Sequence, residues 1–199
     1  MIPNWITLGR IVFSFIVLFM FEIRSLTVNI LAFFSIFVII FLDFLDGYIA
    51  RKYNMSTEFG AMFDITGDRI VEVIFWTYFA YKHLISFWFP IIVLSRGIFT
   101  DAIRHQAMRK GIKPYDMFTK GILRFILVSG WMRTGYAVLK VITFSLLGLL
   151  LILINNNIAF QYKEVMFHIT YVVAVCTVIV CIIRGIPVFV YAKKHIFSK

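Results

Sequence analysis

Apolar runs separated by short polar segments make up most of the chain. A helix needs about 20 apolar residues to cross a bilayer. Two runs are clear candidates, Leu26 to Leu42 and Val165 to Ile183, and a third, Thr134 to Ile154, is interrupted only by Lys140. Shorter runs also cross if their ionisable residues lie at membrane depth and face protein or water; these runs are Ile11 to Phe21, Ile70 to Tyr81 and Leu84 to Ser95. The pattern predicts an all-α integral membrane protein with six transmembrane helices.

The N-terminal segment precedes the first of these runs. Residues 2–8 predict a short interfacial helix, with Trp5 at the level of the lipid headgroups. A secretory signal is disfavoured, because Arg10 lies inside the apolar segment and no small-residue cleavage site follows. With no linker or repeat in the sequence, residues 1–199 are predicted to form a single membrane domain.

The composition agrees with a membrane protein. Of 199 residues, 61% are hydrophobic and 15% charged, whereas a soluble domain is usually about 45–50% apolar. The formal net charge of +10 suits anionic lipid headgroups or phosphorylated substrates, and we predict no nucleic-acid partner. Cys176 and Cys181 lie five apart in one apolar run, so on a helix they point away from each other and form no disulfide.

The basic residues are unevenly distributed between the predicted loops. Most lie in residues 51–57, 105–124 and 193–199, which all fall on one side of a six-span topology. Cytoplasmic loops carry an excess of Lys and Arg. We therefore expect both termini, and any site at that side, to face the cytoplasm of a bacterial plasma (inner) membrane.

Four aspartates lie in or beside very apolar sequence, at the cytoplasmic ends of the second and third predicted spans. Asp43 and Asp46 are three residues apart and Asp64 and Asp68 four apart, so each pair shares a helix face. Converging carboxylates repel one another unless a cation compensates them. Acidic oxygen ligands suit Mg²⁺ or Mn²⁺, so a site for one or two metals is predicted, of the kind that neutralises phosphate oxygens. The competing interpretation is that these aspartates pair with nearby arginines or are solvated helix ends.

The spacing of these residues is specific. The segment reads Asp43-x-x-Asp46-Gly47-x-x-Ala50-Arg51, then Gly60, Asp64 and Asp68. This pattern resembles the complete signature of the CDP-alcohol phosphatidyltransferases. The resemblance implies six transmembrane helices after an N-terminal amphipathic segment, and usually a homodimer.

The resemblance also implies roles for individual residues. The four aspartates would hold two divalent metals on the pyrophosphate of CDP-diacylglycerol, and Asp68 would also be the base that accepts the proton of the attacking hydroxyl. Thr7 and Arg10 belong to a Pro3-Asn4-x-x-Thr7-x-x-Arg10 opening similar to that of the phosphatidylglycerophosphate synthase branch. The implied CDP-binding residues are Gly47, Ala50, Arg51, Gly60, Thr7 and Arg10.

The acceptor alcohol is less clearly specified. Cations at or near membrane depth are explained by a phosphate on the acceptor; the candidates are Arg96, Arg104, Arg133 and Lys140. For Arg104 and Arg133, snorkelling to the headgroups explains the positions equally well. We predict sn-glycerol 3-phosphate as the acceptor, which would give phosphatidylglycerophosphate.

Some sequence features favour other acceptors. Asp64-Ile65-Thr66-Gly67-Asp68-Arg69 is closer to the inositol-lipid branches of the family, and Gly97 stands where the glycerophosphate branch usually has Glu. Inositol phosphate or inositol is therefore the second choice, ahead of serine or a second phosphatidylglycerol. A hypothesis of another class is a small cation transporter, because intramembrane carboxylates also mark ion pathways. It is disfavoured because the acids cluster near one membrane face.

Overall fold

The computed structural model describes residues 2–52, 58–109, 111, 118, 121–158 and 160–195; within these, the side chains of residues 2, 3, 44, 46–51, 58, 61, 160 and 195 lie outside the description. The described chain is all-helical, as predicted. Its helices are α1 (Ile2–Glu22), α2 (Leu26–Lys52), α3 (Glu58–Tyr81), α4 (Trp88–Arg109), α5 (Ile122–Val128), α6 (Gly130–Asn155) and α7 (Lys163–His195), with a short 3₁₀ helix at Phe160–Tyr162.

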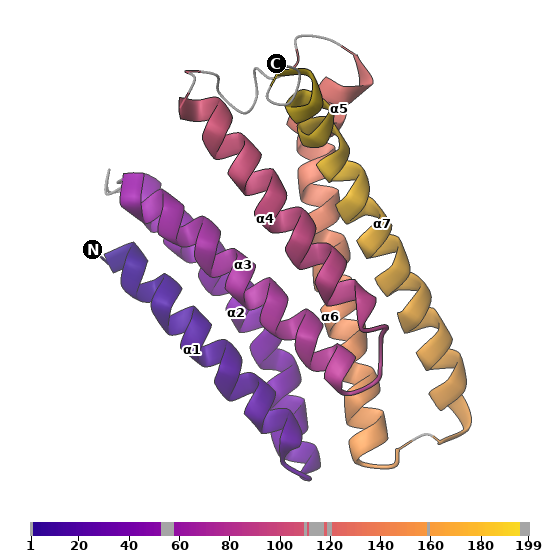
Figure 1. Cartoon of the computed structure of the whole chain (residues 1–199). Coiled ribbons are helices and arrows are strands. Elements are labelled where there is room, and N and C mark those ends of the chain that lie inside the picture. Colours follow the sequence, from indigo (N-terminus) through magenta and orange to yellow (C-terminus); the bar gives the residue numbers. More distant parts are fainter. Residues whose placement is uncertain are drawn as a thin grey trace.

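The long helices alternate in direction. Figure 1 shows the start of α1, the end of α2, the start of α3 and the ends of α4 and α7 toward one end of the molecule. The turns from α1 to α2 and from α3 to α4 lie toward the other end. At about 1.5 Å per residue, even the 21 residues of α1 are about 31 Å long, enough to cross a bilayer. The helix ends beside the basic segments are thus grouped as the sequence predicted.

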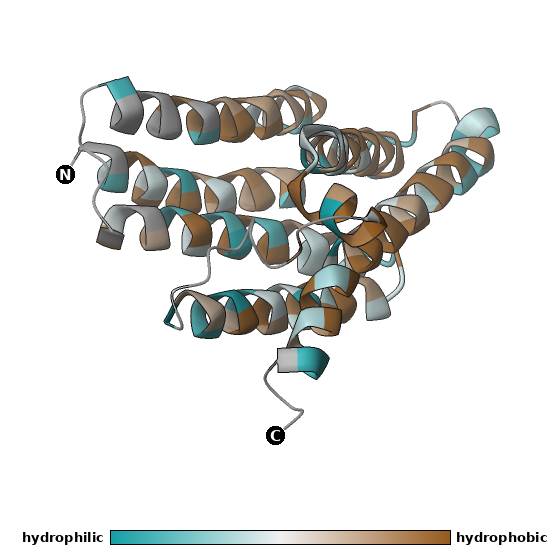
Figure 2. Ribbon diagram, turned by 90° about the horizontal axis from the view of Figure 1, so that it is seen from above, coloured by the Kyte–Doolittle hydropathy of each residue, from teal (hydrophilic) through white to brown (hydrophobic). Residues whose placement is uncertain are grey.

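Apolar side chains point outward along the helices. Figure 2 shows many hydrophobic residues along the long helices, interspersed with hydrophilic ones. Phe19 is 69% exposed, Phe34 59% and Val172 59%, a pattern that would be costly in water. Among the described residues, α1, α2, α6 and α7 are long and apolar enough to span a membrane. These surfaces are those of a membrane protein, with lipid as the solvent of the outer faces.

α3 and α4 are as long as a span but more polar. The ionisable residues responsible are Asp64, Asp68, Arg69 and Glu72 in α3, and Arg96, Asp101 and Arg104 in α4. Four candidate spans are therefore found where six were predicted, and the number of crossings stays a prediction. The predicted bounds of these two helices were too short, because charged residues were treated as boundaries although their partners lie on neighbouring helices.

The separate interfacial helix predicted for residues 2–8 is wrong. α1 runs without a break from Ile2 to Glu22. Pro3 lies in the first turn, where the missing N–H costs nothing. Gly9 does not interrupt the helix, because one glycine costs only about 1 kcal/mol relative to alanine. Trp5 is nevertheless well exposed, as expected for a residue at a membrane surface.

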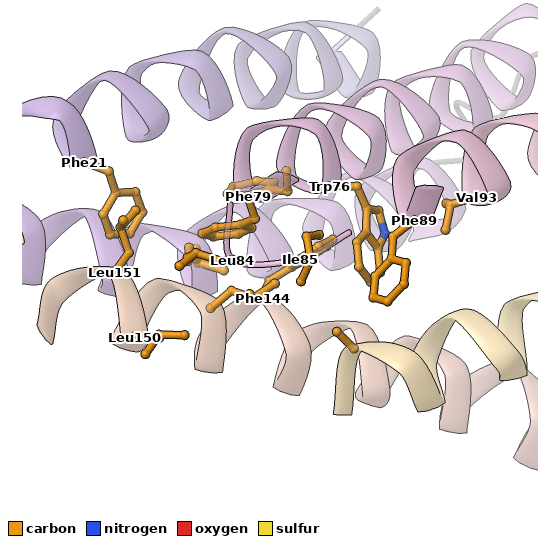
Figure 3. Packing of buried hydrophobic residues seen from close by; sticks show 14 of the residues in the cluster. Phe21, Trp76, Phe79, Leu84, Ile85, Phe89, Val93, Phe144, Leu150 and Leu151 are labelled. Carbon is orange, nitrogen blue, oxygen red and sulfur yellow. The ribbon is translucent and has the colours of Figure 1, made fainter. Parts of the chain in front are cut away.

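An aromatic core joins α3 to α6. The ring of Phe144 lies 5.3 Å from the rings of both Phe75 and Trp76, measured between centroids, and 6.3 Å from that of Phe79. Figure 3 shows Phe79 and Phe144 turned toward each other between these helices. Buried aromatic contacts of this kind stabilise a helix pair beyond their area. This core lies next to Glu72, which precedes Phe75 by one turn and itself contacts the first half of α6 through Tyr136 and Lys140.

Candidate active site

Three carboxylates from two helices meet near the end of the molecule that holds the start of α1. Asp43 comes from the second half of α2, and Asp64 and Asp68 come from α3. One oxygen of each lies within 4.8 Å of the others. All three are partly accessible, with side chains 44–48% exposed. The two predicted helix faces do point at a common place; the side chain of Asp46 lies outside the described residues.

Arg10 of α1 enters this acidic cluster. Its guanidinium contacts Asp43 Oδ1, donates a hydrogen bond from Nη2 to Asp68 Oδ1 at 2.8 Å, and lies 3.6 Å from Asp64 Oδ1. The Arg10 side chain is only 2% exposed. Arg10 thus contacts the carboxylates themselves, and the CDP-binding role that the resemblance implied for it stays a prediction.

Gly67 brings α1 close to α3 beside Arg10. A Cβ atom at Gly67 would lie 2.5 Å from Thr7 Cγ2 and 3.5 Å from Arg10 Nη2. Thr7 is itself buried. The missing side chain at Gly67 therefore allows the helix contact that places Arg10 among the aspartates.

The donor atoms of the acidic cluster fit a hard divalent cation. Only carboxylate oxygens contribute, and three carboxylates against one guanidinium leave two negative charges in the described cluster. Mg²⁺ and Mn²⁺ prefer oxygen ligands of this type. The chemistry of the donor set thus agrees with the metal site that the sequence predicted at Asp43, Asp64 and Asp68.

A second polar cluster lies one helical turn further along α3, at Glu72. This carboxylate is 4% exposed and accepts a hydrogen bond of 2.6 Å from the hydroxyl of Tyr136. Its other oxygen lies 3.5 Å from Lys140 Nζ and 3.3 Å from Arg69 Nη1. A buried carboxylate needs partners of this kind, because desolvation of an unpaired charge is very costly.

Three cations from three different helices lie near the ring of Tyr136. Lys140 Nζ of α6 lies 5.0 Å from its ring centroid, Arg184 Cζ of α7 lies 5.0 Å away, and Arg96 Cζ of α4 lies 5.5 Å away. Arg96 also donates a hydrogen bond from Nε to the carbonyl oxygen of Cys181 at 3.0 Å. We call Arg96, Lys140 and Arg184 the cation cluster. It carries more positive charge than Glu72 offsets.

The acidic cluster and the polar cluster at Glu72 share one pocket, which Lys140 of the cation cluster also lines. Its walls include Arg10, Asp43 and Asp68 of the acidic cluster, together with Glu72 and Lys140. Apolar residues of α2, α3 and α6, such as Ile36, Phe75 and Phe144, line the rest. A bound molecule would therefore meet carboxylates at one side and a lysine at the other.

The other predicted site residues that the structure describes are not among those that line the pocket. Arg104 lies 3.9 Å from Asp101 Oδ1, and the same carboxylate receives Arg69 Nε at 3.0 Å. Arg133 is exposed on α6, and Gly60 is half-buried in the first turn of α3. Nothing is described for the side chains at three positions of the predicted CDP site, namely Gly47, Ala50 and Arg51.

Sequence reasoning missed Glu72, Tyr136 and Arg184. Glu72 follows Asp68 by four residues, so the spacing that grouped the aspartates also places it on their face. Arg184 directly follows the predicted span 165–183, and a cation next to a span is usually interpreted as a headgroup contact. Tyr136 is an ordinary aromatic residue of an apolar helix, and no sequence signal distinguishes it.

Comparisons with known proteins show which family the chain is related to. The family model for CDP-alcohol phosphatidyltransferase matches residues 1–183. The chain belongs to the CDP-alcohol phosphatidyltransferase family. Curated relatives named CDP-diacylglycerol–glycerol-3-phosphate 3-phosphatidyltransferase include one from Wigglesworthia glossinidia brevipalpis, 28% identical over 85% of this chain and 94% of the relative.

Two other relatives with that name match over shorter regions. The protein of Haemophilus influenzae is 34% identical over 55% of this chain and 60% of its own length. The protein of Rickettsia typhi is 37% identical over 35% of this chain, and the match spans 39% of that relative's length. Neither the family nor these names support the cation-transporter hypothesis.

Proposed function

We propose that this member of the family transfers a phosphatidyl group from CDP-diacylglycerol to sn-glycerol 3-phosphate and releases CMP. The observation that carries the proposal is the shared pocket, whose walls hold Asp43 and Asp68 of the acidic cluster together with Glu72 and Lys140. The family match and the names of the relatives support the same reaction. A carboxylate cluster suits a pyrophosphate donor bound through metal, and a cation cluster suits a phosphorylated acceptor.

The proposed chemistry is one displacement at phosphorus. The acceptor hydroxyl oxygen forms a bond to the phosphatidyl phosphorus, and the bond between that phosphorus and the bridging oxygen of CMP breaks. Asp68 accepts the hydroxyl proton, because its carboxylate is about half exposed and lines the pocket that the acceptor enters. Arg10 holds Asp68 and Asp43 in place through its own contacts.

Asp43, Asp64 and Asp68 would hold divalent metal, with Asp46 as a further ligand implied by the family signature. When bound, Mg²⁺ or Mn²⁺ would neutralise the pyrophosphate oxygens of the donor. The sequence signature implies two ions. Arg10, which contacts Asp43 and Asp68 directly, would then share these carboxylates with metal.

Arg96 and Lys140, with Arg184, would bind the phosphate of the acceptor. The donor pyrophosphate repels an anionic acceptor, and the cation cluster offsets this repulsion. Arg104 pairs with Asp101, and Arg133 is exposed, so their proposed part in acceptor binding is electrostatic attraction from the rim. We further propose six crossings, a homodimer, and a site that faces the cytoplasm.

The test is an acceptor panel. The full chain, purified in detergent, is incubated with radiolabelled CDP-diacylglycerol, Mg²⁺ and one acceptor at a time: glycerol 3-phosphate, inositol phosphate, inositol or serine. We expect CMP release to depend on glycerol 3-phosphate. A preference for inositol phosphate would correct the acceptor but keep the reaction. A preference for inositol or serine would refute the phosphate site, and release independent of any acceptor would refute the transferase.

A further inference from the structure

Tyr136 is the common neighbour of the charged residues around the proposed acceptor site. It is 4% exposed, although it lies on an otherwise largely exposed turn of α6. Its ring meets cations from α4, α6 and α7, and its hydroxyl bonds to a carboxylate of α3. Four helices therefore meet through this one side chain.

The cation cluster needs an explanation in physical terms. Three like charges within about 6 Å of one ring centroid repel one another strongly where water is scarce. The negative face of an aromatic ring attracts cations, and more so when they are partly desolvated. Glu72 offsets further positive charge through Lys140. Tyr136 and Glu72 together thus allow the cations to gather before any anionic ligand arrives.

The hydroxyl of Tyr136 fixes the position of the ring. Its bond of 2.6 Å to Glu72 Oε1 ties the tip of the side chain to α3, while the Cα atom belongs to α6. Arg96 is held separately, because its Nε donates to Cys181 and its Cγ would lie only 3.1 Å from a Cβ at Gly185. The Tyr136 ring is therefore fixed at two points, by its backbone in α6 and by the hydrogen bond of its hydroxyl to Glu72 in α3.

We propose that Tyr136 is a positioning residue of the acceptor site: it holds Lys140, Arg96 and Arg184 in one arrangement that fits the phosphate of the acceptor. This inference rests on the proposed function, because it needs an anionic acceptor. The role is preorganisation, since ordered cations bind a phosphate with less loss of side-chain freedom than mobile ones. Tyr136 does not itself touch the reacting atoms.

Two variants separate the ring from the hydroxyl. Tyr136→Leu removes the ring, and we expect the KM for glycerol 3-phosphate to rise about tenfold or more, with the KM for CDP-diacylglycerol almost unchanged. Tyr136→Phe keeps the ring and removes the bond to Glu72, so the acceptor KM should rise only about two- to fivefold. Phe89→Leu is the matched control, because Phe89 is buried on Trp76 and Tyr171, away from the cation cluster. It should leave both KM values unchanged.

The outcomes distinguish the two proposals. If the wild type uses glycerol 3-phosphate and Tyr136→Leu leaves its KM unchanged, or alters both KM values equally, the positioning role is refuted and the proposed function stands. If the wild type prefers an uncharged acceptor, both proposals fail. If Tyr136→Leu does not fold, Tyr136→Phe decides: an acceptor KM raised alone supports the role, and an unchanged KM refutes it.

Discussion

A methyl group at Gly67 should separate the two helices that bring Arg10 to the acidic cluster. In Gly67→Ala the new Cβ would lie 2.5 Å from Thr7 Cγ2, where carbon atoms normally approach to about 3.5–4.0 Å. α1 and α3 must therefore move apart by about 1 Å in this region. Arg10 Nη2, which donates to Asp68 Oδ1, lies 3.5 Å from the same Cβ and would move too.

The effect on stability should be small and that on activity large. Overpacking costs about 1–3 kcal/mol, and the better helix propensity of alanine offsets about 1 kcal/mol of it. A net loss of about 0–2 kcal/mol lowers the Tm of a chain of this size by less than about 8 °C. A displacement of about 1 Å in a catalytic group can reduce turnover about 10²-fold.

The assay compares kcat and Tm across a small set of variants. Gly9→Ala makes the same change on α1, where a Cβ would meet nothing within 4 Å, and should leave kcat unchanged. Thr7→Ser removes the clashing methyl group but keeps the hydroxyl. We expect the double variant Gly67→Ala with Thr7→Ser to recover at least about tenfold of the lost kcat, because the two sites are coupled by contact.

Two results would show that this reasoning is wrong. Normal turnover in Gly67→Ala would mean that the close approach of α1 does not position Arg10. Failure of Thr7→Ser to restore any activity would mean that the loss comes from something other than the Thr7 contact.

Three further predictions concern individual charges. Asp68→Asn should reduce kcat by about 10²–10⁴-fold while CDP-diacylglycerol binding, measured by titration, falls much less; equal losses would assign Asp68 to metal binding alone. Lys140→Gln and Arg96→Gln should each raise the acceptor KM about tenfold, or about 1.4 kcal/mol, with the donor KM unchanged; a defect in donor binding alone would contradict the assignment. Arg10→Gln leaves the converging carboxylates without their cation, so its Tm should fall more in EDTA than in Mg²⁺; equal falls would mean that Arg10 does not compensate their charge.

The sequence predicted the parts of the site that rest on local spacing. Asp43 on one helix and Asp64 and Asp68 on the next do converge, because residues three or four apart share a helix face and the helices are neighbours. The apolar runs also predicted the surface that faces lipid. Like the shared helix faces, this surface depends only on the residues along one helix. The metal and acceptor roles of these residues stay predictions until they are assayed.

Contacts between distant segments were beyond such reasoning. Glu72 and Tyr136 are 64 residues apart, and their hydrogen bond depends on how α3 packs against α6. The bounds of α3 and α4 also depend on tertiary structure, because Arg69 finds Asp101 across the two helices. The separate helix predicted for residues 2–8 is wrong, because neither the proline in the first turn nor the lone Gly9 ends α1, which runs from Ile2 to Glu22.

The most direct test of the account follows the acceptor oxygen. Glycerol 3-phosphate labelled with an oxygen isotope in the attacking hydroxyl is incubated with CDP-diacylglycerol, Mg²⁺ and the purified chain. The label in each product is then measured by mass spectrometry. The account predicts that the label appears in phosphatidylglycerophosphate and never in CMP, and that Asp64→Asn forms neither product. Phosphatidic acid together with a labelled CMP ester of glycerol 3-phosphate, or release of CMP with no labelled lipid, would contradict displacement at the phosphatidyl phosphorus by the acceptor.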